Sequence, residues 1–469
     1  MTADKIKFGT DGWRAIIAQD FTVYNVARVA AAQAKWLLGR GADPKVVIGH
    51  DCRFGGELFA EVVTKVLCSQ GVQVLLAKGF VSTPMVSLGV LQHRTDQGVV
   101  ITASHNPPSY NGYKLKGAHG GPSSPNDIAA VEALIEDEVS IPSVSLAELE
   151  QKGMLSYIDL EAEYITYLQG KFDFEALNKS PFKLAYDAMY GAGQNVIKKL
   201  LPGAVLLHCD SNPGFHGQAP EPLDKNLREL ADTIAQTPEL KLGLATDGDA
   251  DRIGLYDEDG NFVDAHHIIL LLIHYLHKYK NMNGKVAIAF SVTDRVKRLC
   301  EAYNLPIEVT AIGFKYISEI MVHEDVLVGG EESGGIAVKG HIPERDGIYD
   351  GLALYEFMTT TGKTLKELIR EVYDIVGAFV YERADLQIEN TKKEHIIKTA
   401  LAGGYKDAFG KYAFNRTEDI DGMKYHLDNG GWIMLRASGT EPLLRIYAEG
   451  NSKEETLDIL EDVKKVVLN

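Results

Sequence analysis

Residues 101–108, Ile-Thr-Ala-Ser-His-Asn-Pro-Pro, combine a hydroxyl, an imidazole and an amide where an apolar run ends. The run over residues 98–101 predicts a buried strand, and the Asn-Pro pair predicts the turn that ends it. A serine on a rigid strand-end turn can act as a nucleophile or carry a transferred group. Ser104 is therefore the first candidate catalytic residue, and a polar turn without chemistry is the alternative.

Three aspartates, Asp247, Asp249 and Asp251, occupy alternate positions after another predicted strand. Oxygen-only ligands of this kind suit a hard divalent cation. An EF-hand would need glycine at its sixth position, where this chain has Arg252, and a helix on each side of the loop. Here a strand precedes the loop and a hairpin follows it. We therefore expect a Mg²⁺ site that leaves positions for water and a phosphate oxygen; a solvated acidic turn is the alternative.

The segment Arg436-Ala-Ser-Gly-Thr440, with Arg445 shortly after it, has the composition of a phosphate site. Hydroxyls and backbone amides at a glycine turn donate hydrogen bonds, and guanidinium groups bind phosphate bidentately. The net charge of −17 argues against nucleic acid or an anionic membrane as a partner. An anionic substrate would therefore need cations gathered locally, which this loop supplies; a polar surface turn is the alternative.

Three further signals are weaker when each is taken alone. Glu331-Glu-Ser333 lies between glycine pairs and could accept hydrogen bonds from vicinal hydroxyls, although a solvated turn is as good an interpretation. Lys114, ten residues after Ser104, could contact phosphate or carry a proton, although an exposed lysine is the default interpretation. The same alternatives hold for Arg14, which follows a glycine-rich loop. Together the loops offer a hydroxyl carrier, a Mg²⁺ site, a hydroxyl-binding loop and a phosphate clamp. This combination predicts phosphoryl transfer on a phosphorylated sugar.

The elements that must position these loops repeat along the chain. The order strand, helix, strand, helix, strand occurs three times, and the apolar runs indicate mixed or parallel sheets covered by helices. In each copy the unusual loop follows the third strand, and sites in α/β sheets lie at the carboxyl ends of strands. We therefore expect three equivalent loops to converge on one cleft. The predicted strands cover residues 45–49, 72–77, 98–101, 183–187, 204–207, 240–245, 286–290, 307–310 and 326–328.

The pattern changes in the last hundred residues. Two helical stretches and a strand at residues 431–435 are expected before the arginine-rich loop, and a strand at 444–448 after it. The final helix begins with the capping box Ser452-Lys-Glu-Glu455. We interpret this part as a small α+β domain. The predicted domains are residues 1–150, 151–258, 259–376 and 377–469.

Composition and cysteine use restrict the class of protein. The chain is 45% hydrophobic and 24% charged, which is typical of a soluble globular protein. The longest purely apolar run, residues 268–273, is too short to span a bilayer, and no signal peptide is expected. The four cysteines are scattered, so we expect reduced thiols and a cytoplasmic location.

In these loops the chain resembles the α-D-phosphohexomutases, in particular their phosphoglucomutase/phosphomannomutase branch, over essentially its whole length. Residues 102–107 resemble the phosphoserine loop of that family, and residues 247–252 resemble its metal loop. Residues 330–334 resemble its sugar loop, and residues 436–442 its phosphate loop. Four motifs in order and at family-like spacing are specific, whereas any one of them alone is not.

The resemblance implies a molecule with three tandem α/β domains of the same topology, with mixed sheets. A C-terminal α+β lid domain completes a heart-shaped molecule around a central cleft. It implies an enzyme that interconverts hexose 1-phosphate and hexose 6-phosphate through phosphorylated Ser104. One Mg²⁺ per chain and a hexose 1,6-bisphosphate, which is both intermediate and activator, are the implied cofactors. A small phosphosugar is the implied partner, and the chain would act as a monomer or homodimer.

The resemblance also assigns roles residue by residue. The implied catalytic residues are Ser104, His105, Lys114 and Arg14, and the implied metal ligands are Ser104, Asp247, Asp249 and Asp251. The implied substrate-binding residues are Arg252, Gly313, Glu331, Ser333, Arg345, Arg436, Ser438, Gly439, Thr440 and Arg445.

Departures from the family pattern concern the choice of sugar. Relatives with Met after the first Glu of the sugar loop are often dual-specificity phosphomannomutases, and relatives with Gln there are often phosphoglucosamine mutases. Glu332 therefore favours glucose, with mannose also possible, and Gly335 replaces a histidine that some relatives place in the site. The alternatives are a phosphoglucosamine mutase or another sugar-phosphate mutase. From another class, a sugar-phosphate-binding protein that has lost catalysis is the alternative, against which the intact Ser104 and aspartates argue.

Overall fold

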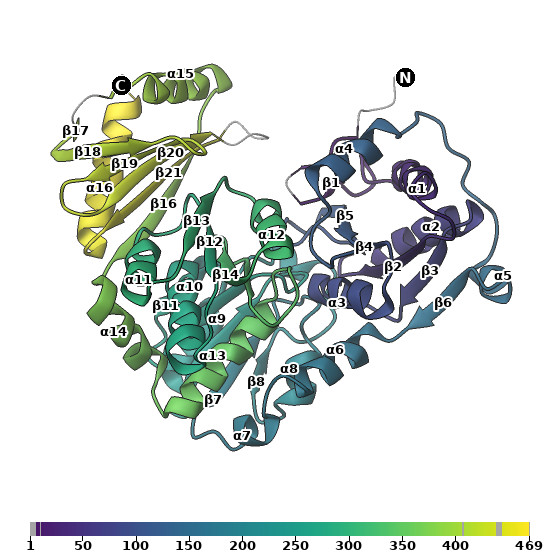
Figure 1. Ribbon diagram of the computed structural model, residues 1–469, viewed down its shortest axis with the longest axis horizontal. Coiled ribbons are helices and arrows are strands. Elements are labelled where there is room, and N and C mark those ends of the chain that lie inside the picture. The colour runs from purple at the N-terminus through teal and green to yellow at the C-terminus, as the bar shows by residue number, and fades with distance from the viewer. Residues whose placement is uncertain (1–5, 10, 406–407, 438–442, 469) are drawn as a thin grey trace. The chain divides into compact units, whose positions relative to one another are not determined.

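The computed structural model describes residues 6–9, 11–405, 408–437 and 443–468 (Figure 1). The chain divides into two compact units. The first unit comprises Met1–Ala287 and Gly313–Ile369, and the second comprises Ile288–Ile312 and Arg370–Asn469.

The first sheet is mixed and has the strand order β1-β5-β4-β2-β3-β6. β2 pairs in parallel with β3 and β4, whereas β5 pairs antiparallel with β4 and β1. Val46 and Ile48 of β2 pack into the core formed with helices α1 and α2, whereas Val47 faces helix α3. This alternation explains why the strand is apolar throughout, because both of its faces are covered. The elements are β1 (Trp13–Ile16), α1 (Val23–Leu38), β2 (Lys45–His50), α2 (Gly56–Ser69), β3 (Gln73–Ala77), α3 (Thr83–His93), β4 (Gln97–Ile101), β5 (Tyr110–Gly117), α4 (Pro125–Ala133), α5 (Leu146–Gln151) and β6 (Leu155–Ile158).

The second sheet is also mixed, with the order β11-β10-β9-β7-β8. β7 pairs in parallel with β8 and β9, and β9 continues into an antiparallel pairing with β10. The elements are α6 (Leu160–Gln169), α7 (Phe174–Asn178), β7 (Lys183–Asp187), α8 (Val196–Leu200), β8 (Val205–Leu207), η1 (Phe215–Gly217), η2 (Asp224–Asn226), α9 (Arg228–Gln236), β9 (Leu240–Thr246), β10 (Ile253–Tyr256) and β11 (Phe262–Val263).

The third sheet has the order β13-β12-β14-β15, and the boundary between the units falls within β12. β14 and β15 pair antiparallel. The elements are α10 (Ala265–His274), η3 (Tyr275–Tyr279), β12 (Lys285–Ala289), α11 (Arg295–Tyr303), β13 (Ile307–Thr310), α12 (Phe314–His323), β14 (Val326–Gly330), β15 (Ile336–Val338), α13 (Gly347–Thr361) and α14 (Leu365–Val376).

These three sheets share a core of four strands in one order. The cores are β5-β4-β2-β3, β10-β9-β7-β8 and β15-β14-β12-β13. In each core the third strand along the chain is followed by a loop and then by an antiparallel strand. These loops are the ones that contain Ser104, the three aspartates and Glu331. The predicted repeat of three mixed α/β sheets is therefore confirmed, and the heart-shaped arrangement stays a prediction.

The fourth sheet is antiparallel throughout, in the order β16-β21-β20-β19-β18-β17. Helix α16 packs against it, with Val463 and Val467 buried in its core. The prediction of two helical stretches before residues 431–435 is wrong, since one helix and four strands lie there. Strands β16 and β18 are only half-buried and rich in charged residues, so they lack an apolar pattern. The elements are β16 (Val380–Gln387), α15 (Asn390–Leu401), β17 (Ala408–Phe409), β18 (Tyr412–Glu418), β19 (Met423–Leu427), β20 (Trp432–Ala437), β21 (Leu443–Gly450) and α16 (Lys453–Leu468).

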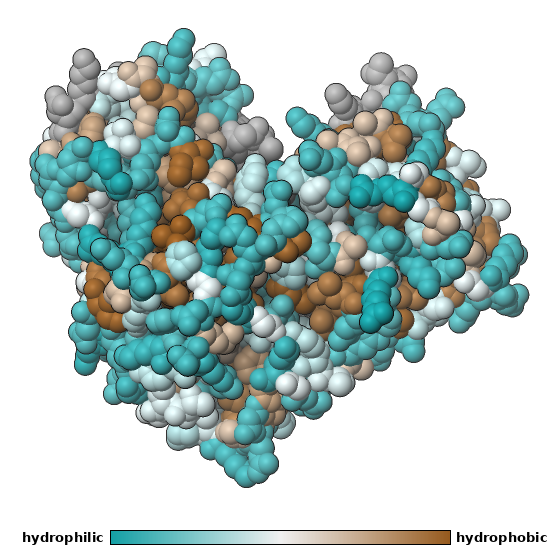
Figure 2. All heavy atoms as spheres, viewed as in Figure 1, coloured by the Kyte–Doolittle hydropathy of each residue, from teal (hydrophilic) through white to brown (hydrophobic). Residues whose placement is uncertain are grey.

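Hydrophilic side chains cover much of the face shown in Figure 2, with hydrophobic side chains between them. Among the described residues, no helix is both long and apolar enough to cross a membrane.

Candidate active site

The loop after β4 holds Ser104 in an uncommon backbone conformation. Ser104 has a φ of 51°, in the left-handed region that residues other than glycine, asparagine and aspartate rarely adopt. Its N–H donates to Thr102 Oγ1 at 2.8 Å, and its hydroxyl donates to Asp247 Oδ2 at 2.7 Å. The Nδ1 atom of His105 lies 3.4 Å from the same hydroxyl. A strained serine that is held from both sides points to function rather than to an ordinary turn.

Arg53, which was not among the predicted site residues, fixes this loop. Its guanidinium donates to the carbonyl of Ser104 and, at 2.6 Å and 2.9 Å, to the carbonyls of Asn106 and Pro107. Asp51 pairs with Arg53 at 3.3 Å and accepts from Thr102 Oγ1. Burial raises the pKa of Asp51 to about 6, although Arg53 opposes the shift. The sequence signal for this clamp is an Asp-Cys-Arg motif at the end of a predicted strand.

The loop after β9 brings three buried carboxylates together. One oxygen of each of Asp247, Asp249 and Asp251 lies within 4.8 Å of the others. Asp247 Oδ1 accepts the N–H groups of Asp251 and Arg252, at 2.9 Å and 3.1 Å. The Oδ1 atoms of Asp249 and Asp251 are buried and have no hydrogen-bond partner among the described residues. Buried carboxylate oxygens without a partner are costly, so this donor set fits a hard divalent cation such as Mg²⁺.

Two glycines allow the surrounding loops to approach the metal loop. A Cβ atom on Gly248 would lie 2.5 Å from the carbonyl oxygen of Ser104, so a larger residue would push the two loops apart. A Cβ atom on Gly191 would lie 2.7 Å from the carbonyl oxygen of Asp247. These contacts place the loops after β4, β7 and β9 against one another, and of these the loops after β4 and β9 occupy equivalent positions in their sheets.

Lys114 and Arg345 neutralise part of this negative charge. Lys114 Nζ lies 2.8 Å from Asp249 Oδ2 and 3.0 Å from Asp251 Oδ2. Arg345 Nη2 lies 2.7 Å from Asp251 Oδ2, and both cations also contact Asp11. Lys114 and Arg345 are nearly inaccessible, with side-chain exposures of 1% and 4%. The structure therefore places Arg345 among carboxylates, and its predicted contact with substrate stays a prediction.

The protonation of the cluster follows from these contacts. Burial alone would lower the pKa of Lys114, but Asp11, Asp249 and Asp251 raise it well above its usual value. Burial, with the neighbouring charges of Asp249 and Asp251, raises the pKa of Asp247. Lys114 therefore stays protonated at neutral pH, and three carboxylates so close together require a cation to be ionised together.

Arg14, Arg252 and His105 also lie beside the Ser104 loop. Arg14 Nη1 donates to Asn106 Oδ1 at 2.7 Å, and Arg252 Nη1 lies 3.7 Å from Glu221 Oε1. Burial, together with Arg252 and Arg14, lowers the pKa of His105 well below its usual range. His105 is therefore a neutral imidazole beside the serine hydroxyl.

The loop after β14 packs onto the strand that follows the metal loop. Ile253 N–H donates to the carbonyl of Gly334 at 3.0 Å. Burial raises the pKa of Glu331 to about 7, opposed by Arg345 and by a hydrogen bond from the backbone of Gly313. A Cβ atom on Gly335 would lie 2.5 Å from Arg345 Cδ, so no larger residue fits there while Arg345 keeps its place. Ser333 is half-buried at the same loop.

In the second unit, Arg436 and Arg445 face each other across strands β20 and β21. Arg436 Nε donates to Asp421 Oδ1 at 3.1 Å, and Arg445 Nε is buried without a partner among the described residues. Two like charges opposite each other are unfavourable unless an anion lies nearby. The predicted phosphate ligands Ser438, Gly439 and Thr440 lie outside the described residues.

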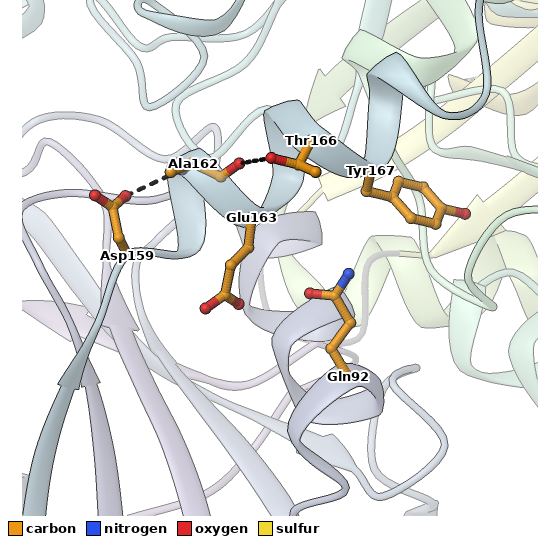
Figure 3. A pocket seen from close by; sticks show the side chains of 6 residues that line it. All are labelled: Gln92, Asp159, Ala162, Glu163, Thr166 and Tyr167. Atoms are coloured by element: carbon orange, nitrogen blue, oxygen red, sulfur yellow. Dashed lines mark hydrogen bonds between the residues drawn. The ribbon is translucent and has the colours of Figure 1, made fainter.

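A separate cavity of 360 Å³ involves none of the predicted site residues (Figure 3). It lies at helices α3 and α6, and one of its carboxylates, Glu163, pairs with His93 Nε2 at 2.9 Å. Asp159 caps α6 by accepting from Ala162 N–H at 3.0 Å. Its lining residues are Gln92, Asp159, Ala162, Glu163, Thr166 and Tyr167.

Known proteins resemble the whole chain. The domains of the phosphoglucomutase/phosphomannomutase family match in order, with alpha/beta/alpha domains I, II and III at residues 5–141, 162–260 and 264–376 and the C-terminal domain at 387–466. A phosphoglucomutase/phosphomannomutase of Thermococcus kodakarensis is 29% identical, over 97% of this chain and 96% of the relative. A protein of Methanosphaera stadtmanae assigned as a phosphoglucosamine mutase is 30% identical, over 98% of each chain.

A solved structure of a protein from Thermus thermophilus, assigned as a phosphomannomutase, is 33% identical to this chain. Its TM-score is 0.88, and the match covers 100% of both chains. The chain therefore belongs to the phosphoglucomutase/phosphomannomutase family of the α-D-phosphohexomutase superfamily.

Proposed function

We propose that this protein is a phosphohexomutase that interconverts hexose 1-phosphate and hexose 6-phosphate, with Ser104 carrying the phosphoryl group. The observation that supports this most directly is the contact of Ser104 Oγ with Asp247 Oδ2 at 2.7 Å, beside the unpartnered oxygens of Asp249 and Asp251. A hydroxyl alone on a turn would be unremarkable chemically. A strained hydroxyl at the edge of a divalent-cation site suits phosphoryl transfer.

In the proposed reaction, a phosphoryl group on Ser104 Oγ passes to the free hydroxyl of a hexose monophosphate. The bond between phosphorus and Ser104 Oγ breaks as a bond to the sugar oxygen forms; the sugar hydroxyl loses its proton, Ser104 Oγ gains one, and a 1,6-bisphosphate results. The bisphosphate then reverses its orientation in the site and transfers its other phosphoryl group to Ser104 Oγ. Each half-reaction therefore conserves the phosphoryl group, and the enzyme is restored.

Asp247, Asp249 and Asp251, with Ser104, would hold Mg²⁺. When bound there, Mg²⁺ supplies positive charge that offsets the negative charge of the transferring phosphoryl group. Lys114, protonated and 2.8 Å from Asp249, would stabilise the same charge, and it is the candidate general acid/base for the proton that passes between the sugar hydroxyl and Ser104 Oγ. In the unmodified serine, the hydroxyl proton is directed at Asp247 Oδ2, and neutral His105, 3.4 Å from Ser104 Oγ, is a second polar group within reach of that oxygen.

The rest of the substrate would be held by two groups of residues. Glu331 would accept hydrogen bonds from sugar hydroxyls, and Ser333 would donate to or accept from them. Their loop lies close enough for this role because it packs onto the strand after the metal loop. Arg436 and Arg445, paired across β20 and β21, would bind the phosphate that is not transferred. One family neighbour has been solved with GlcNAc-6P and magnesium, and another with glucose 1,6-bisphosphate, which agrees with this class of ligand.

For the sugar itself, we propose glucose phosphates as the preferred substrate, with mannose phosphates also accepted. Glu332 favours glucose by its resemblance to family variants, and the crowding of Gly335 by Arg345 leaves no room for the histidine found in other relatives. A phosphoglucosamine mutase is the second candidate, because relatives covering the whole chain carry that name.

The sugar preference is tested by measuring kcat/KM for the 1-phosphates of glucose, mannose and glucosamine. Fastest turnover of glucosamine 1-phosphate would overturn the glucose preference.

The phosphoserine step is tested by Ser104→Ala, with Ser109→Ala in the neighbouring exposed loop as the matched control. We expect kcat of the Ser104→Ala variant to fall by about 10⁴-fold or more, because the carrier oxygen is lost. Binding of a hexose phosphate, followed by calorimetry, should survive. Intact mass should show one phosphate on the wild type and on Ser109→Ala, and none on Ser104→Ala. Wild-type turnover in Ser104→Ala would exclude the mechanism. An unphosphorylated wild type that stays inactive with added hexose 1,6-bisphosphate would favour a binding protein without catalysis.

A further inference from the structure

Asp11 forms the centre of a group of cations that the proposed mechanism leaves unexplained. Its Oδ2 atom lies 2.8 Å from Lys114 Nζ and 2.6 Å from Arg345 Nη2. Arg14 Nη2 lies 3.7 Å from the same oxygen, and Lys116 Nζ lies 3.8 Å from Oδ1. Burial opposes ionisation of Asp11, but these cations, Lys114 and Arg345 foremost, hold its pKa well below the usual range. Asp11 is therefore an ionised carboxylate shared by four cations.

The two nearest of these cations also contact the metal loop, and they do so selectively. Lys114 contacts Oδ2 of both Asp249 and Asp251, and Arg345 contacts Oδ2 of Asp251. The hydroxyl of Thr83 also donates to Asp249 Oδ2. The Oδ1 atoms of both aspartates, by contrast, are buried and have no partner among the described residues. One oxygen of each carboxylate is therefore held by the protein while the other is left available to a cation.

The loop that carries Asp11 is held close to strand β5, which contains Lys114. Gly9 N–H donates to the carbonyl of Gly12 at 2.9 Å, which closes the loop. Gly12 has a φ of 96°, and a Cβ atom there would lie 2.8 Å from the carbonyl oxygen of Tyr113. Gly12 thus lets the short carboxylate of Asp11 lie against β5, because a side chain at position 12 would push the two segments apart.

We propose that Asp11 is a positioning residue for the Mg²⁺ site and acts through Lys114 and Arg345. It holds the two cations so that each is shared between Asp11 and the metal loop. They then orient Asp249 and Asp251 through Oδ2 and leave Oδ1 free to bind the metal ion. Without Asp11, Lys114 would be shared only between Asp249 and Asp251, and Arg345 only between Asp251 and Glu344, among the described residues. Both cations would then act more strongly on the metal-binding carboxylates and compete with the divalent cation. This inference rests on the proposed function, because it requires the metal loop to bind Mg²⁺.

The charge balance supports this role. Lys114, Arg345 and the three metal-loop aspartates carry two positive and three negative charges, so most of the negative charge is already neutralised without Mg²⁺. Asp11 adds a fourth carboxylate that binds the cations but lies outside the set of three grouped oxygens. It therefore draws positive charge away from the metal loop without itself joining the ligand set. Groups of this kind, beyond the ligands themselves, commonly change metal affinity about 10- to 100-fold when they are removed.

The test is titration of Mg²⁺ into the phosphate-free, chelator-treated full-length protein by calorimetry. Three proteins are compared: the wild type, Asp11→Asn and the control Asp20→Asn. The control removes the same charge from the same N-terminal segment, but Asp20 makes none of the described contacts to Lys114 or Arg345. We expect the Mg²⁺ dissociation constant of Asp11→Asn to rise at least about tenfold, and that of Asp20→Asn to stay within about twofold of the wild type. Asp11→Glu, which restores the charge, should recover part of the affinity.

A purely structural role for Asp11 would change the melting temperature but not the Mg²⁺ affinity of the folded protein. Unchanged affinity in folded Asp11→Asn would therefore overturn the proposal. If Asp11→Asn does not fold, Arg345→Lys tests the proposal instead. Lysine keeps the charge but lacks the forked guanidinium group, so Mg²⁺ binding should weaken at least about threefold. Unchanged affinity would overturn the proposal. Asp249→Asn separates this result from the proposed function. If the wild type and Asp249→Asn bind Mg²⁺ equally, the metal site itself is wrong; if only the Asp11 variant matches the wild type, the positioning role alone is wrong.

Discussion

Two of the almost completely buried lysines among the described residues, Lys114 and Lys424, have surroundings that are opposite in kind. Lys114, in the first unit, lies within 3.0 Å of carboxylate oxygens from Asp11, Asp249 and Asp251. Lys424, in the second unit, lies 4.1 Å from the ring centre of Trp432, and its nearest carboxylate oxygen, on Asp294, is 3.5 Å away. Both side chains are only 1% exposed.

The pKa values of the two lysines shift in opposite directions. Burial lowers the pKa of Lys424, and Asp294 offsets only part of this shift. For Lys114 the same burial is outweighed by three carboxylates, so its pKa rises. Lys424 is held mainly by packing against aromatic rings and by the attraction of its charge to the ring faces. This aromatic cluster joins the segment 288–312 to the fourth sheet within the second unit. Lys114 is surrounded by more negative charge than it can neutralise, which is expected where another cation binds.

The same substitution at both lysines tests this comparison, and the largest effect is expected at Lys114. We expect Lys114→Met to lower kcat/KM by about 10³-fold, because a charge that stabilises the transferring phosphoryl group is lost. It should also lower the free energy of unfolding by about 3–5 kcal/mol in metal-free buffer, because buried carboxylates lose their shared cation. Steady-state kinetics and urea unfolding measure the two effects.

Lys116→Met is a useful partner for this variant, since Lys116 is equally buried but pairs with Glu344. It should destabilise the protein comparably while lowering kcat/KM far less than Lys114→Met does. Equal losses of activity in the two variants would show that the loss at position 114 arises from general destabilisation.

The comparison extends to carboxylates, and the next effect is expected at Glu331. Burial raises the pKa of Glu331 to about 7, so burial dominates there as it does at Lys424. The protonated form is favoured in the folded state. The stabilisation this gives is fully present below the usual pKa of a glutamate and is lost as the pH rises through about 7.

We therefore expect the stability of the wild type, relative to Glu331→Gln, to fall by about 2–3 kcal/mol between about pH 5 and pH 8. Urea unfolding of both proteins at several pH values measures this difference. Glu332→Gln, in the same loop, is the control for removal of a carboxylate from this position of the chain. A flat difference across that range would mean that Arg345 compensates fully for the burial of Glu331.

Much of the site could be predicted because the signals are local. Ser104, the three aspartates and Glu331 each follow the third strand of a repeated sheet pattern, and equivalent strand ends bring their loops together. These features depend on short segments and on the periodicity of strands and helices.

The features that were not predicted depend on distant pairs. Asp11 and Arg345 are 334 positions apart, and Arg53 and the carbonyl of Ser104 are 51 positions apart, so nothing near either residue indicates its partner. The half-buried strands β16 and β18 were not predicted for another reason. Their charged residues break the alternation on which strand prediction relies, and the sheet forms through pairing with β21 and β19.

The smallest effect is expected from Lys424→Met. Methionine keeps most of the apolar contact with Trp432 and Phe290 and removes a buried charge whose desolvation is unfavourable. Asp294 keeps Lys297 as a partner at 2.9 Å, so no carboxylate is left buried and alone. We expect the free energy of unfolding to fall by about 1 kcal/mol or less, through loss of the attraction between the cation and the rings.

The value of kcat/KM of Lys424→Met should stay within about twofold of the wild type, since no predicted site residue of the second unit contacts Lys424 among the described residues. A loss of activity comparable to that of Lys114→Met, without a matching loss of stability, would show that Lys424 also acts in the reaction. The contrast between a lysine fixed by aromatic rings and one surrounded by carboxylates would then not separate structural from catalytic cations.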